Sequence, residues 1–516
     1  MNASAKVDID VVELTIAQLQ EGYSRGRFTA EAIARAHLAR IERYESAYNA
    51  FTFLNPAAID DARAIDRRRT AGEALGPLAG VPVVVKEAMD FVGLPSTIGW
   101  APLCGKTGGI DLMPERDAPV VARLRAAGAV ILGKTNIPAF SHDGARANSS
   151  WDGPTFNAID RSIVPGASSS GTATAVAASF AVVGLAEETG GSIQNPAAAQ
   201  SLFSVKPTFG LVPNTGVAPL AGSTRDVVGP HARSAIDAAI LLDALAGYTV
   251  EDPKTVASIG KMPAGGYAAA LRADALAGAR LGLYGAGWRE QPLSAETETL
   301  YEAAKADLRA CSAALVDDPF AGSGFAGLAL KDVEFDDRGL ESMAYDMENY
   351  LRRLGPSAAA HSFAGLKAIA PQDPFGPEGI LGMHLNSLPT LRKSLEDPTT
   401  PPDLSAFIAL RLRYLEIFDA VMDRSNLLAL AFPQSFAALP GVFDKATYPA
   451  TTVSEINIAG LPGVTAPAGR NGSGAPFSLI FVGRMWSEAN LLSLAHAYEK
   501  AYSRRIVPEL TDQTAS

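Results

Sequence analysis

The chain has 516 residues and a formal net charge of −11, with 47 % hydrophobic and 19 % charged residues. This composition is typical of a folded globular protein and argues against a disordered chain. The acidic balance argues against nucleic acid and anionic membranes as partners, because no basic excess is available to neutralise phosphates. The length predicts one large α/β unit or a small number of domains.

The two cysteines, Cys104 and Cys311, lie far apart in the sequence. Neither has a spaced partner of the kind that marks a metal site, and two thiols make no disulfide framework. We expect no metal and no cofactor. The first ten residues lack the apolar run of a signal peptide, and no segment resembles a membrane-spanning helix. The cytoplasm is therefore the expected location.

The first elements are two predicted helices over 12–47, of which the second begins after Thr29, a favourable N-cap residue. The run 80–86 is short and apolar, which is typical of a strand buried on both faces of a sheet. A helix over 118–127 separates it from a second strand at 129–132. The first quarter of the chain thus predicts a strand–helix–strand order.

Later elements repeat this alternation. A helix over 173–178 precedes a strand at 181–185, and a strand at 279–284 precedes a helix that Ser294 can cap. Strands that alternate with helices indicate an α/β fold with helices on both faces of a sheet. The stretch from about 320 to 410 is irregular and rich in proline, so we interpret it as a cap-like insertion over the main sheet.

Two runs rich in glycine and serine stand out, at 165–172 and 188–196. The first lacks the lysine that ends a phosphate-binding loop, and no dinucleotide fingerprint is present. In the second, Thr189-Gly-Gly-Ser192 offers consecutive backbone N–H groups beside one hydroxyl, as an oxyanion hole with its nucleophile requires. A glycine-rich turn capped by serine explains the same pattern equally well.

A serine nucleophile needs a base, which is most often histidine. The six histidines share no motif, and only His142 and His231 lie near the two runs, so both are weak candidates. Ser192 does not form a G-x-S-x-G elbow either, because Gln194 occupies the second glycine position. From the residues alone the identity of the base stays open.

Together with their flanks, these runs resemble the amidase signature family. The matching segments are Gly166-Ala-Ser-Ser-Ser-Gly-Thr172, Thr189-Gly-Gly-Ser-Ile-Gln-Asn-Pro196 and Lys206-Pro-Thr-Phe-Gly210, with 80–90, 133–136, 226–230, 459–463 and Gly483-Arg484 around them. The resemblance spans roughly 12–502 and implies a mixed, mostly parallel twisted sheet. It implies a single amidase domain over 1–516, divided into N-terminal helices (12–70), the signature core (75–250), a variable substrate-pocket region (about 320–410) and a C-terminal return to the core (450–502).

The resemblance also implies a Ser–Ser–Lys triad. Ser192 matches the acylated nucleophile, Ser168 the bridging serine that follows a cis peptide bond, and Lys86 the terminal base. The oxyanion hole would be formed by Thr189, Gly190, Gly191 and Ser192. Lysine must be neutral to accept a proton, and burial beside the apolar run Val81 to Val85 favours the neutral amine.

Four departures from the family pattern concern the surroundings of the triad. Ala167 and Ser170 replace glycines, and Glu187-Glu188 replaces Thr-Asp. Gln194 stands where arginine is common, with Asn195 beside it. If these two amides face the acyl pocket, they offer a substrate neutral hydrogen bonds in place of a carboxylate clamp.

We therefore expect a serine amidohydrolase that cleaves the C–N bond of a small, uncharged aryl or alkyl amide through an acyl-enzyme. The same triad could serve a carbamate, ester or hydrazide hydrolase. An amidotransferase A-type subunit is disfavoured by the missing arginine and the low basic charge, and a non-catalytic binding homologue by the presence of all three triad residues. The expected partner is a small-molecule amide. A homodimer is compatible with the sequence, which leaves the oligomeric state open.

Overall fold

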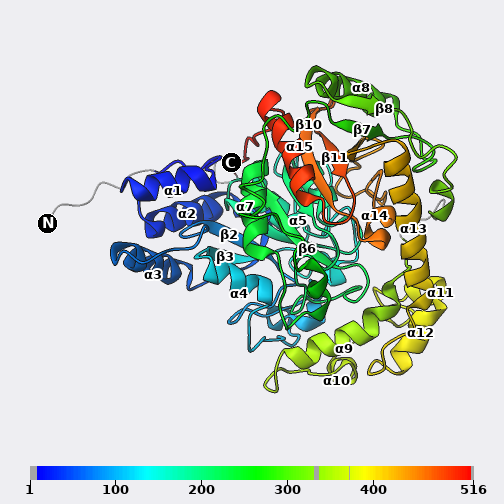
Figure 1. Cartoon of the computed structure of the whole chain (residues 1–516). Coiled ribbons are helices and arrows are strands. Elements are labelled where there is room, and N and C mark those ends of the chain that lie inside the picture. Colours follow the sequence, from blue (N-terminus) through cyan, green and yellow to red (C-terminus); the bar gives the residue numbers. More distant parts are fainter. Residues whose placement is uncertain (1–8, 330–335, 371, 513–516) are drawn as a thin grey trace.

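The computed structural model describes residues 9–329, 336–370 and 372–512. The expectation that the first ten residues contain no signal peptide concerns a segment that lies mostly outside the described residues. Within these ranges, eleven strands form one sheet in the order β1-β3-β2-β4-β6-β5-β10-β11-β9-β7-β8 (Figure 1). The strands are β1 (Phe51–Leu54), β2 (Pro82–Lys86), β3 (Val130–Thr135), β4 (Val183–Glu188), β5 (Phe203–Lys206), β6 (Val227–Ala232), β7 (Arg280–Leu283), β8 (Ala314–Val316), β9 (Ala429–Pro433), β10 (Gly463–Arg470) and β11 (Pro476–Val482).

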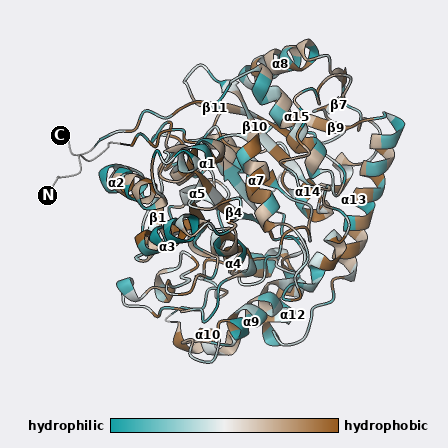
Figure 2. Ribbon diagram, turned by 60° about the vertical axis from the view of Figure 1, so that its left-hand side comes forward, coloured by the Kyte–Doolittle hydropathy of each residue, from teal (hydrophilic) through white to brown (hydrophobic). Residues whose placement is uncertain are grey.

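Helices cover the sheet and extend beyond it at one end. They are α1 (Ile16–Ser24), α2 (Ala30–Tyr48), α3 (Ala58–Thr70), α4 (Pro119–Ala126), α5 (Ser170–Ala177), α6 (Gln194–Ala199), α7 (Ala235–Leu245), α8 (Ala295–Ala310), α9 (Met343–Arg353), α10 (Phe363–Ile369), α11 (His384–Ser387), α12 (Pro389–Glu396), α13 (Ser405–Arg424), α14 (Ser454–Ala459) and α15 (Glu488–Ala501). In Figure 2 hydrophilic colours mark much of α3, α8 and α13, which lie on the outside of the molecule.

The predicted local elements are confirmed. The two helices expected over 12–47 are α1 and α2, and the Thr29 hydroxyl accepts a hydrogen bond from the backbone N–H of Ala32 at the start of α2. The Ser294 hydroxyl accepts in the same way from Thr297 at the start of α8. Such caps satisfy backbone donors that a helix leaves unpaired in its first turn.

The sheet is mixed, but the expectation that it is mostly parallel was wrong. Among the described strands, six of the ten pairings are antiparallel. The parallel pairings join β2 to β3 and β4, and β7 to β8 and β9. Between these two groups neighbouring strands run in opposite directions. A short turn joins β10 to β11, and these two strands pair antiparallel with each other, with β5 and with β9.

The interior around β2 positions the candidate site. Val83, Val84 and Val85 are fully buried, as a strand covered on both faces requires. Helix α5 lies against this part of the sheet, and all eight of its residues are buried. The Thr172 hydroxyl of α5 contacts the Thr135 hydroxyl of β3 at 2.7 Å and donates to the Leu185 carbonyl of β4 at 3.2 Å. These bonds fix the start of α5 beside the end of β2.

Helices α9 to α12, from the region expected to be variable, group together at one side of the molecule (Figure 1). Of these helices, α9 contacts the main body at Asp90, which accepts hydrogen bonds from Tyr350 at 2.9 Å and from Arg353 at 3.1 Å. Within the ranges described above, no helix is both long enough and apolar enough to cross a membrane.

Candidate active site

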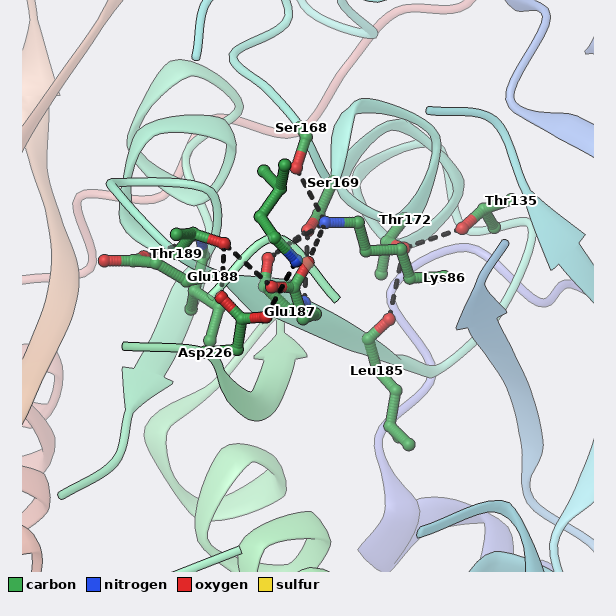
Figure 3. Close-up of polar contacts among 12 residues, drawn as sticks. Lys86, Thr135, Ser168, Ser169, Thr172, Leu185, Glu187, Glu188, Thr189 and Asp226 are labelled. Atoms are coloured by element: carbon green, nitrogen blue, oxygen red, sulfur yellow. Dashed lines mark hydrogen bonds and ion pairs between the residues drawn. The ribbon is translucent and has the colours of Figure 1, made fainter. Parts of the chain in front are cut away.

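Lys86 ends β2 with a fully buried side chain. Its Nζ lies 2.7 Å from the Ser168 Oγ, 2.6 Å from a carboxylate oxygen of Glu187 and 3.1 Å from the Glu187 carbonyl oxygen (Figure 3). An ammonium has three N–H donors, so these three acceptors match it one for one. The geometry therefore joins the lysine and the first serine of the implied triad.

Ser168 lies just before α5, in the first of the two glycine- and serine-rich runs. The peptide bond between Ala167 and Ser168 is cis, as the resemblance implied. The neighbouring Ser169 hydroxyl donates to the Glu187 carbonyl at 3.1 Å, and Figure 3 shows both serines on the same side of Glu187. The start of α5 is thereby tied to the end of β4.

Ser192 lies between β4 and α6 and is 5 % exposed. Gly191, with φ at +92°, adopts the left-handed conformation that glycine tolerates best. The Glu188 carboxylate accepts from the backbone N–H groups of Ile193 at 2.8 Å and Gln194 at 3.2 Å, which fixes the turn after the serine. Among the described residues, the Ser192 hydroxyl makes no hydrogen bond, so the Ser168–Ser192 bond of the implied relay is not formed here.

The Ser168 and Ser192 loops nevertheless pack directly on each other. A Cβ on Gly166 would lie 2.4 Å from the Pro196 Cα, so only glycine allows this approach. The Gly144 carbonyl accepts from the Ala167 N–H at 3.1 Å and from the Asn195 side-chain amide at 3.4 Å, one contact from each loop. The fold thus brings the loops of all three implied triad residues to one place.

Gln194 and Asn195, the two residues expected to contact substrate, are both buried. The Gln194 side-chain amide donates to Glu188 at 2.5 Å, and Asn457 of α14 donates to the same carboxylate oxygen at 2.7 Å. This geometry favours a supporting role for Gln194 in the loop after Ser192. Its contact with a substrate stays a prediction, as does that of Asn195.

A second carboxyl group lies behind Glu187. The Thr189 hydroxyl donates to Asp226 at 2.6 Å and lies 3.3 Å from the other Glu187 carboxylate oxygen (Figure 3). Burial, and then the negative charge of Glu187, raise the pKa of Asp226 to about 7. Sequence reasoning noted Glu187 only as a departure and Asp226 only as a motif residue, and assigned a role to neither.

The two weak histidine candidates have other partners. His231 Nε2 lies 2.8 Å from the Ile193 carbonyl oxygen, and burial lowers the pKa of His231 to about 4. His142 Nε2 lies 2.6 Å from His384 Nε2, and burial lowers the pKa of His142 to about 4 as well. In the described part of the chain neither ring hydrogen-bonds to Ser192. The same part contains no cluster of three or more His, Cys, Asp or Glu residues able to hold a metal ion.

Comparisons with known proteins show what this chain is similar to. The chain is 32 % identical to the A-type subunit of the glutamyl-tRNA(Gln) amidotransferase of Moorella thermoacetica, in an alignment that covers 97 % of this chain and 99 % of that one. The protein of the same name from Salinispora arenicola is 40 % identical over 278 residues, where the match spans about half of each chain, 53 % and 54 %. The solved structure of native peptide amidase from Stenotrophomonas maltophilia is similar with a TM-score of 0.76 and 30 % identity, over 96 % of this chain and 99 % of that one.

The predicted α/β fold is confirmed by this structural similarity. The model of the family described as Amidase matches residues 32–372, about two thirds of the sequence. The chain therefore belongs to the amidase signature family.

Proposed function

We propose that this protein is a serine amidohydrolase that cleaves the C–N bond of a neutral acyl amide through an acyl-enzyme at Ser192. What supports the proposal above all is the 2.7 Å hydrogen bond between Lys86 and Ser168, which lies at the end of a buried strand. The loop of Ser168 packs against the loop that carries Ser192. Family membership supports a hydrolase acting on C–N bonds.

The chemistry follows from the residue types. Once neutral, Lys86 accepts the proton of Ser168, which accepts the proton of Ser192 as its oxygen attacks the carbonyl carbon. Backbone N–H groups of the Thr189–Ser192 turn stabilise the negative charge on the carbonyl oxygen. The relay run backwards protonates the leaving amine, and water then hydrolyses the ester on Ser192. The Ser168–Ser192 hydrogen bond would form when substrate binds, since catalytic contacts often tighten only in the complex.

Charges around the site favour a neutral substrate. Glu187, Glu188 and Asp226 are all buried within this network. The guanidinium of Arg225 is already engaged, because its Nε donates to the Thr189 carbonyl at 3.1 Å and an Nη to the Asp336 carbonyl at 2.6 Å. A substrate carboxylate would therefore meet several negative groups, and the Arg225 guanidinium would not be available to bind it with two N–H groups.

The test compares a neutral acyl anilide or peptide amide with its carboxylate-bearing analogue. We expect kcat/KM to favour the neutral substrate at least tenfold, which corresponds to about 1.4 kcal/mol. Gln194→Arg should leave this ratio unchanged, because the new guanidinium would pair with Glu188. A preference of the wild-type protein for the anionic analogue would contradict the proposal.

Labelling with a fluorophosphonate separates the nucleophile from the substrate question. Mass spectrometry should find the adduct on Ser192, and Ser192→Ala should abolish it. An adduct on Ser169, Ser170 or a serine beside a histidine would overturn the assignment of Ser192.

A second function, as the A-type component of an amidotransferase, is favoured by the similarity to the Moorella protein over nearly its whole length. The two candidates differ in what the isolated chain does. An amidohydrolase cleaves the neutral amide alone. A chain that releases ammonia from glutamine only when partner subunits and misacylated tRNA are added would instead be an amidotransferase component.

A further inference from the structure

Lys86 forms a buried ion pair with Glu187. Glu187 replaces the threonine of the family pattern, and its carboxylate oxygen lies 2.6 Å from the Lys86 Nζ. Both side chains are withdrawn from solvent, with 0 % of the lysine and 3 % of the glutamate exposed. Ion pairs at the surface contribute little, but in a dry site a neighbouring charge decides strongly which protonation state is favoured.

The two contacts of Glu187 also orient the lysine. A neutral amine has two N–H donors and one lone pair, one donor fewer than the ammonium. If the carbonyl and carboxylate oxygens of Glu187 accept the two donors, the lone pair points to the third neighbour, Ser168. That is the atom whose proton the base must accept.

The same carboxylate opposes the loss of the lysine proton. With Lys86 protonated the pair is neutral, and deprotonation leaves the Glu187 charge buried without its partner. The other groups nearby do not replace that partner. Asp226 faces Glu187 across Thr189 with a pKa raised to about 7, and Glu188 is bound by Gln194 and Asn457. His231 on β6, whose pKa is lowered to about 4 by burial and in part by the charge of Lys86, is neutral at neutral pH.

We infer, on the basis of the proposed function, that Glu187 is a positioning residue that aims the Lys86 amine at Ser168 and moves the acidic limb of the pH–rate profile to higher pH. The family threonine at this position would supply no charge, so this chain should need a more alkaline medium than the same site without Glu187. Glu187 thereby shifts the pH range over which the site is active.

The experiment measures the rate constant for fluorophosphonate labelling of Ser192 from pH 5 to 11, in the wild type and in Glu187→Thr and Glu187→Gln. Loss of a charge at this distance should move the midpoint of the acidic limb down by on the order of 1–3 pH units in both variants. The plateau rate should fall, because the amine is no longer held toward Ser168. Glu187→Asp keeps the charge and should stay closer to the wild type than either neutral variant.

Glu499→Gln is the matched control. Burial raises the pKa of Glu499 to about 7, so this carboxyl titrates within the pH range of the experiment. Its contacts are with Ala235 and His496, away from the site. Its limb should coincide with that of the wild type. An acidic limb at the wild-type midpoint in Glu187→Thr and Glu187→Gln, or one moved to higher pH, would overturn the inference.

A second measurement decides the matter without turnover. The Lys86 Cε carbon, assigned by ¹³C NMR in Ser192→Ala with labelled lysine, should titrate at lower pH when Glu187→Gln or Glu187→Thr is added. An unchanged titration overturns the role of Glu187 even if the enzyme is active. A wild-type protein that does not label at Ser192 contradicts the proposed function, while the NMR titration still tests Glu187. If the neutral variants do not fold, Glu187→Asp is compared with the wild type by the same titration, and an identical midpoint with identical labelling counts against the inference.

Discussion

Two buried lysines on neighbouring strands differ in what their serine neighbours can do. Lys86 on β2 donates to Ser168, and Lys134 on β3 donates to Ser96 at 3.0 Å. Each has a glutamate nearby, Glu187 at 2.6 Å from Lys86 and Glu87 at 3.9 Å from Lys134. Both lysines are fully buried. Burial with a hydroxyl and a carboxylate is therefore common to the two sites.

The difference lies in the fate of the serine proton. The Ser96 hydroxyl donates to Asp90 at 3.2 Å, so its proton is already committed and no second serine follows it. Ser168 lies instead in a loop packed on that of Ser192, whose hydroxyl has no acceptor among the described residues. Burial lowers the pKa of Lys134, and that of Lys206 to about 8, yet neither faces a nucleophile. Burial alone therefore does not make a lysine a candidate base. The serine that it contacts must in turn lie beside the loop of a nucleophile.

The strongest test of this comparison replaces each residue of the implied triad with alanine. Lys86→Ala, Ser168→Ala and Ser192→Ala should each lower kcat/KM by at least about 10³-fold, because one proton path runs through all three. Steady-state kinetics of single and double variants measure this. The double variants should be hardly slower than the single ones. Losses that multiply independently would show that the three residues do not act as a unit.

Lys134→Ala should instead lower the stability of the fold and leave the labelling of Ser192 unchanged. It removes the donor to the Pro95 carbonyl and Ser96 and leaves Glu87 buried without its cation, so the free energy of unfolding should fall by roughly 3–5 kcal/mol. Urea unfolding measures the change. The folded fraction should still label Ser192 at the wild-type rate, and adding Glu87→Gln should restore part of the stability. A stable Lys134→Ala protein that no longer labels would erase the distinction between the two lysines.

The smallest expected effect concerns His231, a buried base that faces a carbonyl and not a hydroxyl. Its folded pKa of about 4 lies below the value of ~6.5 in an unfolded chain. Between these values the unfolded state binds more protons, so the free energy of unfolding falls as pH drops below ~6.5 and is fully retained above it.

His231→Gln should remove this contribution. Urea unfolding at pH 7 and pH 5.5 should show that the wild type loses about 1 kcal/mol more than the variant over that interval. An equal loss in the two proteins would mean that His231 is not held neutral by burial.

Local patterns were sufficient to predict the elements that bear the site. The apolar run that ends at Lys86 is confirmed as β2, and the glycine-rich runs form the loops beside α5 and α6. The resemblance to the family's motifs implied Lys86, Ser168 and Ser192, and their catalytic roles stay a prediction. Neither periodicity nor composition could supply the base, since lysine serves as one only in the right surroundings.

The residues that sequence reasoning missed depend on contacts between distant segments. Glu187 meets Lys86 because β4 lies parallel to β2, although the two residues are 101 positions apart. Asn457 meets Glu188 across 269 positions, which is why the orientation of Gln194 could not be predicted. The prediction of a mostly parallel sheet was wrong for the same reason. The direction of β10 and β11 is set by their pairing and not by their local pattern.

The place of β10 and β11 in the sheet has a consequence for how the chain is made. These strands come almost last in the sequence, yet they lie between β5 and β9 and join the two halves of the sheet. During synthesis β5 and β9 leave the ribosome with unpaired edges. The edge of β5 stays open until Thr465 has followed, and that of β9 until Val482 has followed. Open strand edges pair with other chains, so the growing protein is most prone to aggregate just before its final strands arrive.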